Sequence, residues 1–447
     1  MSKNSGDSKN PAPTLSQELI RQEQQVISTG GQKVATLAGI VLDRAQGRHI
    51  TDVDGRTYLD FMAGIGVCSL GYSHPRYVAA LTDQLHRITV GSFTSPNRVK
   101  FLTRMAQVAP GELNLTQLYS GGAEAVEAAV RLAKSYTKKS EVLAFWGGFH
   151  GKTGGVLGLM GSTFKQHWGP LHPGLFLTPY AYCYRCPFKL EYPACGLHCL
   201  EFARQVIRLN TTGELAAILV EPIQGTAGNV IPPREFLPGL MQIAKEHGAL
   251  LIADEMLTGF GRTGTMFGCD HFGVIPDIMT IGKGMGSGFP VSGLISTPAI
   301  MAAEPYSKPS AASSSYGGNP LAATAAWITL ETILAENLVE NSARVGAYLL
   351  ERLLELKEKY PFIGRVEGRG LMIGLEFVKD QTSKELLDGK VMEIIFKESL
   401  QRGLLAMNYT AQFRLNPPLS LTREEAQAGA AILDEVFAYI AREVPYR

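Results

Sequence analysis

The sequence lacks any long hydrophobic run. No segment approaches the roughly 20 consecutive apolar residues that a membrane-spanning helix needs, and the first residues, MSKNSGDSKNPAPTLSQ, have no apolar core of the kind found in secretory signals. We therefore expect a cytoplasmic protein with no membrane partner. Its polar first dozen residues are expected to be disordered.

Cysteine and net charge are also scarce. Six cysteines in 447 residues are too few for a disulfide scaffold. The chain has 42 Lys and Arg against 41 Asp and Glu, so it has no basic excess that would favour binding to nucleic acid. With 45% hydrophobic and 19% charged residues it is typical of a globular protein, and its length predicts more than one domain.

Short apolar runs alternate with helical patterns in the middle of the chain. The runs are EVLAFW from 141, AAILVE from 216, ALLIADE from 249 and DIMTIGK from 277. This order predicts buried parallel strands in an α/β sheet flanked by helices. Strand patterns around the Asp54-Gly55 turn, and a helical stretch followed by short strands after Pro320, predict a smaller α+β domain formed by both chain ends. The expected segments are a tail and first helix (1–35), the first part of the small domain (36–80), the large domain (81–335) and the rest of the small domain (336–447).

A glycine-rich loop enters a helix at Ser120-Gly121-Gly122-Ala123. The N-terminus of a helix presents backbone N–H groups and the positive end of the helix dipole, which suits a phosphate. For an isolated Gly-Gly pair before a helix, a plain tight turn is the more common explanation.

Two charged residues follow neighbouring predicted strands. Asp254 ends one strand and Lys283 ends the next. The carboxyl ends of strands face the ligand crevice of open α/β sheets, and a desolvated lysine is the nucleophile that Schiff-base chemistry needs. The alternative is that both side chains are simply solvated at the sheet edge.

These elements together resemble the class III aminotransferases, a subgroup of the fold type I enzymes that use pyridoxal 5'-phosphate (PLP). The resemblance covers roughly residues 40 to 435. It rests on motifs that occur in the family's order: DFMAGIGVCSLGYSHP, SGGAEAVEAAVRLAK, GGFHGKT, EPIQG, ADEMLTGFGRTG, PDIMTIGKGMGSGFP, SSYGGNP and FRLNPPL.

The resemblance implies roles for residues around the cofactor. Lys283 would hold PLP as a Schiff base and later carry the proton, while Asp254 would pair with the pyridine nitrogen. Further contacts would come from the phosphate-binding backbone of Gly122 and Ala123, from Phe149 and His150 beside the ring, from Met256 behind it, from Glu221, and from Ser315 of a second copy. The last contact implies a homodimer with a shared active site, with a tetramer as the alternative.

The resemblance also implies substrate-binding residues. Arg414 matches the arginine that binds a substrate carboxylate, and Glu221 matches the acidic residue that pairs with it when no carboxylate is present. A structural salt bridge is the other explanation for such an arginine. Ile65 stands where decarboxylating members have Gln, and Lys152 where enzymes acting on 4-aminobutyrate or ornithine have Arg. The sequence therefore disfavours decarboxylation and weakens an acidic-substrate assignment.

Two further positions depart from the family. Gly121 replaces the usual Ser or Thr, and Leu257 replaces a Gln that contacts the phenolic oxygen of the cofactor. Leu257 cannot make that hydrogen bond.

Four cysteines cluster in YCYRCPFKLEYPACGLHC, at Cys183, Cys186, Cys195 and Cys199. Their spacing allows a tetrahedral zinc site. Because the family generally needs no metal, free thiols or a redox-sensitive loop are the favoured explanation, and we expect no metal centre.

We therefore expect a ping-pong aminotransferase. It would take the amino group from a primary amine, diamine or ω-amino acid and give it to a 2-oxo acid such as pyruvate or 2-oxoglutarate. An amino acid racemase or epimerase of the same family is the alternative, suggested by Leu257. An inactive binding protein is a third possibility, which intact Lys283, Asp254 and Arg414 argue against.

Overall fold

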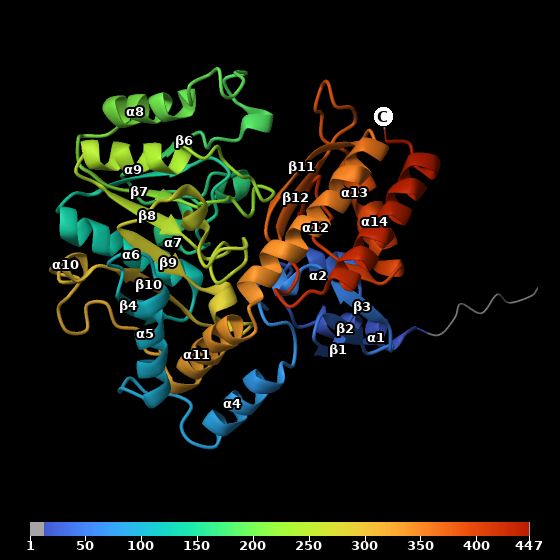
Figure 1. Ribbon diagram of the computed structural model, residues 1–447, viewed down its shortest axis with the longest axis horizontal. Coiled ribbons are helices and arrows are strands. Elements are labelled where there is room, and N and C mark those ends of the chain that lie inside the picture. Colours follow the sequence, from blue (N-terminus) through green and yellow to red (C-terminus); the bar gives the residue numbers. More distant parts are fainter. Residues whose placement is uncertain (1–12, 447) are drawn as a thin grey trace, which may run out of the picture.

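The computed structural model describes residues 13–446. Figure 1 shows two parts side by side: a larger one containing α5 to α11 and a smaller one containing both ends of the described chain. The tail that we expect to be disordered, residues 1–12, lies outside the described residues.

A seven-stranded sheet forms the centre of the larger part, in the order β4-β10-β9-β8-β7-β5-β6. Five neighbouring strands, from β9 to β6, run parallel, and β10 is antiparallel to both of its neighbours. The strands are β4 (Leu115–Tyr119), β5 (Glu141–Phe145), β6 (Leu175–Thr178), β7 (Leu215–Val220), β8 (Leu250–Asp254), β9 (Ile278–Ile281) and β10 (Ser292–Ser296). The predicted mainly parallel sheet is confirmed.

Helices cover both faces of this sheet because alternate side chains of its buried strands point to opposite faces. On one face Val142 and Leu219 pack with α6 (Gly122–Thr137). On the other, Leu143 and Ile218 pack with α8 (His198–Asn210) and α9 (Phe236–Glu246). The strands β4, β9 and β10 also pack against α5 (Pro96–Val108) and α11 (Pro320–Ala335).

The smaller part contains two sheets. One has the order β1-β2-β3-β13 and the other β11-β12-β14. The strands are β1 (Leu42–Gln46), β2 (His49–Asp52), β3 (Thr57–Asp60), β11 (Ile363–Arg369), β12 (Met372–Phe377), β13 (Leu404–Leu405) and β14 (Gln412–Leu415). Because β13 pairs in parallel with β3, the two ends of the chain build one α+β unit, as expected.

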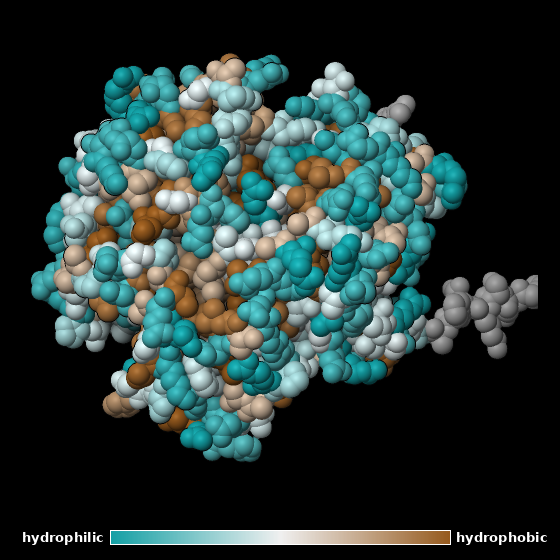
Figure 2. Space-filling model, viewed as in Figure 1, coloured by the Kyte–Doolittle hydropathy of each residue, from teal (hydrophilic) through white to brown (hydrophobic). Residues whose placement is uncertain are grey.

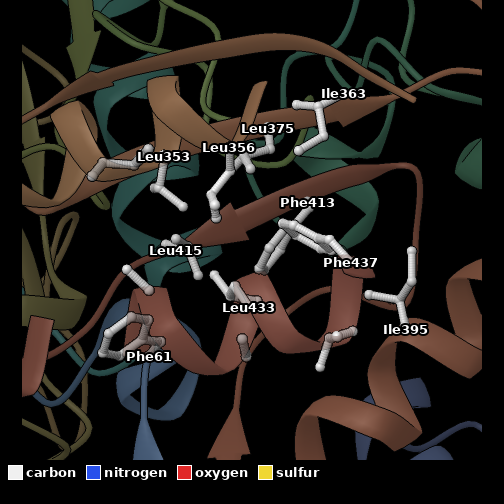
Figure 3. Close-up of a cluster of buried hydrophobic side chains, with 14 of the residues drawn as sticks. Phe61, Leu353, Leu356, Ile363, Leu375, Ile395, Phe413, Leu415, Leu433 and Phe437 are labelled. Carbon is white, nitrogen blue, oxygen red and sulfur yellow. The ribbon is translucent and has the colours of Figure 1, made fainter. Parts of the chain in front are cut away.

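One hydrophobic core joins these ends. Figure 3 shows Phe61, from the N-terminal segment, among side chains of the last hundred residues such as Phe413, Leu433 and Phe437. The core is covered by α12 (Leu338–Lys359), α13 (Gly389–Gln401) and α14 (Arg423–Glu443). An ion pair between Arg48 and Glu425 (2.8 Å) adds a second connection between the two ends.

The remaining α-helices of the described chain are α1 (Leu15–Glu23), α2 (Lys33–Ala38), α3 (Ala63–Gly66), α4 (Pro75–Leu85), α7 (Gly154–Leu157) and α10 (Pro298–Met301). The predicted boundary at residue 80 falls inside α4, and the domain limits stay predictions. Hydrophobic and hydrophilic residues are mixed on the face seen in Figure 2. None of the helices within residues 13–446 is long and apolar enough to cross a membrane.

Candidate active site

A cavity of about 410 Å³ lies where β8 and β9 end beside the N-terminus of α6. This size is in the range of small-molecule sites. The structure brings seven predicted site residues together in its wall: Gly122, Ala123, Phe149, His150, Asp254, Met256 and Lys283. Sequence reasoning did not assign roles there to Val67, Ser120, Gly151 or the segment 288–291, which also line it.

Hydrogen bonds position the N-terminus of α6 at the edge of the cavity. The Glu124 carboxylate accepts hydrogen bonds from the N–H groups of Ser120 (3.1 Å) and Gly121 (3.3 Å), and the Ser292 hydroxyl donates to the Gly121 carbonyl (2.8 Å). The first N–H groups of a helix have no partner within it. Gly122 and Ala123 thus present N–H donors in the cavity wall, as an anion site requires.

Asp254 is fixed by three hydrogen bonds. Its Oδ2 lies 2.7 Å from Nδ1 of His150, while Oδ1 accepts from the Thr280 hydroxyl and the Met256 N–H, both at 3.1 Å. The residues are only 2% (Asp254) and 3% (His150) exposed. Burial favours protonation, but His150, Lys283 and the Met256 N–H outweigh it and lower the pKa of Asp254. Asp254 is therefore ionised at neutral pH.

Lys283 follows β9 in a left-handed backbone conformation, with φ +42°. Such a φ is uncommon for a residue other than glycine and is concentrated at functional sites. Burial lowers the pKa of the Lys283 ammonium, and the positive charge of Arg414 lowers it further, against the opposing effect of Asp254 and Glu221. The environment thus favours the neutral, nucleophilic amine.

Arg414 lies close enough to Glu221 for their charges to interact, and its side chain also interacts with Tyr409. Glu221 accepts hydrogen bonds from the N–H groups of Phe149 and Gly225, both at 2.9 Å, and burial raises its pKa. No carboxylate of the described residues is within ion-pair distance of the Arg414 guanidinium. The two side chains are thus near each other without forming the predicted direct pair.

Ile65 belongs to a strained turn. Ala63, Gly64, Ile65 and Gly66 all have positive φ, from +48° to +73°, and a β-branched residue rarely adopts such a conformation. The Asp60 carboxylate holds the turn by accepting hydrogen bonds from the N–H groups of Met62 (2.7 Å) and Ala63 (2.9 Å). Val67, just after the turn, lines the cavity, whereas Ile65 itself does not.

Leu257 fits between two glycines. A Cβ atom at either Gly66 or Gly225 would lie 2.4 Å from a methyl carbon of Leu257. The absent side chains at both positions therefore make room for the leucine that replaces the family's Gln.

Three other predictions fall outside the cavity wall. Lys152 is exposed, with its ammonium 4.6 Å from the centre of the Phe164 ring, and Ser315 is exposed as well. The cysteines 183, 186, 195 and 199 are free thiols around a separate, small cavity. In the described part of the chain, no group of three or more His, Cys, Asp or Glu residues is arranged to hold a metal ion.

Two contacts that support the site were not predicted. The pairing of His150 with Asp254 joins the loop after β5 to the end of β8, and Thr280 reaches Asp254 from the neighbouring strand β9. The sequence signal for the second contact was that Thr280 lies in the predicted strand next to the one that Asp254 ends. In the structure, Thr280 of β9 is the register partner of Asp254 of β8.

Known proteins resemble this chain over almost its whole length. Residues 30–437 match the family Aminotransferase class-III. An alanine/serine racemase from Pyrococcus horikoshii is 35% identical over 95% of this chain and 91% of its own length. The 4-aminobutyrate aminotransferase GabT from Escherichia coli is 34% identical, with 94% and 98% covered. A crystal structure of a PLP-bound amine transaminase from an uncultivated Pseudomonas species superposes with a TM-score of 0.86 at 32% identity, covering 92% of this chain and 98% of that one. The chain belongs to the class III aminotransferase family and is a PLP-dependent aminotransferase.

Proposed function

We propose that this enzyme moves an amino group from a primary amine, a diamine or an ω-amino acid to a 2-oxo acid, in the cavity between β8, β9 and α6. The observation that carries the proposal is the convergence of a partly buried lysine, a buried ionised aspartate and a helix N-terminus in one cavity. Lys283 and Asp254 are the proposed catalytic residues.

The residues present fit PLP. The N–H groups of Gly122 and Ala123 suit its phosphate, and Phe149 and Met256 offer apolar surfaces for a flat ring. Asp254, kept ionised by His150, suits a protonated pyridine nitrogen. When bound there, the cofactor withdraws electrons from the substrate carbon that loses a proton.

The protein's own groups would handle the proton. Once the amino group of the donor has displaced Lys283, the neutral Nζ can take a proton from the substrate carbon and return it at another carbon. The lowered pKa of Lys283 favours this, because it increases the fraction of the amine that is neutral and able to act as a base. Asp254 keeps its negative charge throughout.

Arg414 is the proposed carboxylate-binding residue. It is a partly buried cation close to Lys283 and Glu221, and no carboxylate in the described part of the chain forms an ion pair with it. Glu221 would compensate this charge when a donor without a carboxylate is bound. Ile65 and Lys152 are proposed to border the donor site, and the apolar Ile65 disfavours decarboxylation.

We further propose a homodimer in which Ser315 of one copy completes the phosphate site of the other. Exposed apolar side chains on and after α4 support an interface, among them Leu85, Ile88 and Phe93, the last 88% exposed. We also place the enzyme in the cytoplasm.

The proposal is tested with the purified holoenzyme and its Lys283→Ala variant. Reduction with borohydride should fix the cofactor covalently on the peptide that contains Lys283 in the wild type, and on no peptide in the variant. Primary amines, diamines and ω-amino acids are then incubated with pyruvate or 2-oxoglutarate, and both products are measured. Labelling of the variant would contradict the lysine assignment, and the absence of any amino product from the 2-oxo acid would contradict the proposed reaction.

Amino acid racemisation is the second candidate. It is favoured by the similarity to the alanine/serine racemase and by Leu257 at the position where the family usually has Gln. Chiral chromatography of single L-amino acids incubated without an oxo acid decides between the two, because a racemase forms the D-enantiomer without net transfer of the amino group.

A further inference from the structure

A segment of the larger part reaches across to the smaller part. It contains Tyr182 and Arg185, which follow β6 and precede α8. The hydroxyl of Tyr182 and the Nε of Arg185 (2.5 Å) both donate to the carboxylate of Glu376, a residue of β12 that is 0% exposed. Arg185 also donates to the carbonyl of Lys384 (2.5 Å), and Lys384 donates back to the carbonyl of Tyr184 (3.1 Å).

A second contact joins the same sheet to the loop that begins at Glu221. Arg365, on β11, donates to the carbonyl of Gly228 (2.8 Å) and lies 5.1 Å from the ring centre of Tyr182. The backbones meet closely there, because a Cβ atom at Gly374 of β12 would lie 2.1 Å from the Gly228 carbonyl oxygen. The two contacts fix this sheet against the part that carries Lys283.

The sheet held in this way carries Arg414. Strand β12 pairs with β14 so that Gly374 lies opposite Arg414 and Glu376 lies opposite Gln412. Within residues 13–446 no carboxylate forms an ion pair with Arg414, and its side chain interacts instead with Tyr409, in the loop that leads into β14. The place of the guanidinium therefore depends on the position of β14 and this loop. A displacement of this sheet would therefore move the guanidinium relative to Lys283.

We propose that Tyr182, Arg185, Arg365 and Glu376, here called the Glu376 clamp, are positioning residues that set the place of Arg414 for a substrate carboxylate. The inference rests on the proposed role of Arg414. A buried carboxylate is stable only while its donors stay in place, so the clamp has one well-defined geometry. Substrates without a carboxylate do not use Arg414 and should not depend on the clamp.

The test compares acceptors with and without a carboxylate on the holoenzyme. Tyr182→Phe removes only the hydroxyl and keeps the ring beside Arg365, whereas Arg185→Met removes the charge. We expect either change to raise KM for the 2-oxo acid about tenfold, the scale of one charge-assisted hydrogen bond. KM for an aliphatic aldehyde acceptor should stay within about twofold of the wild type.

Arg204→Met is the matched control. Arg204 makes a two-point ion pair with Glu246 (3.0 Å) between α8 and α9, in the same part of the fold but away from the small sheet. Its loss should change neither KM. Thermal unfolding of each variant shows whether it is folded, and Tyr182→Phe keeps the test decisive if Arg185→Met does not fold.

The Arg414→Met variant tests the role of Arg414 separately from the role of the Glu376 clamp. If it leaves KM for the 2-oxo acid unchanged, the proposed role of Arg414 fails. If Arg414→Met raises that KM but folded clamp variants do not, or if they raise KM for both acceptors equally, the clamp has no specific positioning role and the inference is overturned.

Discussion

Replacing His150 by Leu should reduce catalysis by weakening Asp254. The His150–Asp254 hydrogen bond is short (2.7 Å) and almost fully buried. A hydrogen bond to a charged group contributes about 1.5–3 kcal/mol, which corresponds to a loss of about 10- to 150-fold in kcat/KM if the bond is needed in the transition state. His150→Asn should recover part of this loss, because its amide can donate to the same oxygen.

The pH profile gives a sharper measurement than the rate alone. His150 contributes to lowering the pKa of Asp254, so in His150→Leu that pKa rises and the carboxylate is protonated at a higher pH. The acidic limb of kcat/KM should therefore move toward neutral pH, and cofactor affinity measured by absorbance titration should fall. An unchanged acidic limb with full activity, or an Asn variant no better than Leu, would refute the role assigned to His150.

Other predictions concern stability and reactivity. Gly66→Ala should lower the free energy of unfolding by about 1–3 kcal/mol, measured with denaturant, because Gly66 has a positive φ and its new Cβ would collide with Leu257. The double variant Gly66→Ala/Leu257→Ala should lose less stability than the two single variants added together, because the smaller residue removes the collision. Arg48→Met should cost about 1–3 kcal/mol at neutral pH. Arg48 lowers the pKa of Glu425 against the effect of burial, so the stability from this ion pair is present above the carboxyl pKa of the unfolded chain. The stability lost in Arg48→Met should therefore disappear as pH falls through the lowered pKa of Glu425. A stability loss that does not depend on pH would contradict the pairing. Burial and the neighbouring cysteines raise the pKa of the Cys183 thiol to about 11, so alkylation should be slow at pH 7 and accelerate toward pH 11; fast modification at pH 7 would contradict this.

The predictable parts of this molecule are those that local pattern determines. Continuous apolar runs placed the parallel strands, and residues at their carboxyl ends, such as Asp254 and Lys283, necessarily meet at one sheet edge. The grouping of Phe149, His150 and Met256 in the cavity wall came from the family resemblance.

What the sequence did not reveal depends on side-chain geometry between distant segments. Nothing local indicates that His150 pairs with Asp254, or that Glu376 receives hydrogen bonds from Tyr182 and Arg185. The cysteine spacing suggested a possible metal site, but spacing along the chain does not decide whether four sulfur atoms can surround an ion. Ile65 likewise gives no sign in the sequence of its left-handed backbone.

The pairing of β3 with β13 has a consequence for biosynthesis. Leu59 cannot find its partner Leu404 until most of the polypeptide has left the ribosome. At about 5–20 residues per second, the N-terminal strands of a nascent chain wait on the order of tens of seconds with an unpaired edge and an exposed Phe61. The larger part contains its own strands in one continuous stretch and can fold first. The late closure of the smaller part is therefore the stage at which a chaperone would be most useful, and at which the chain is most prone to aggregate.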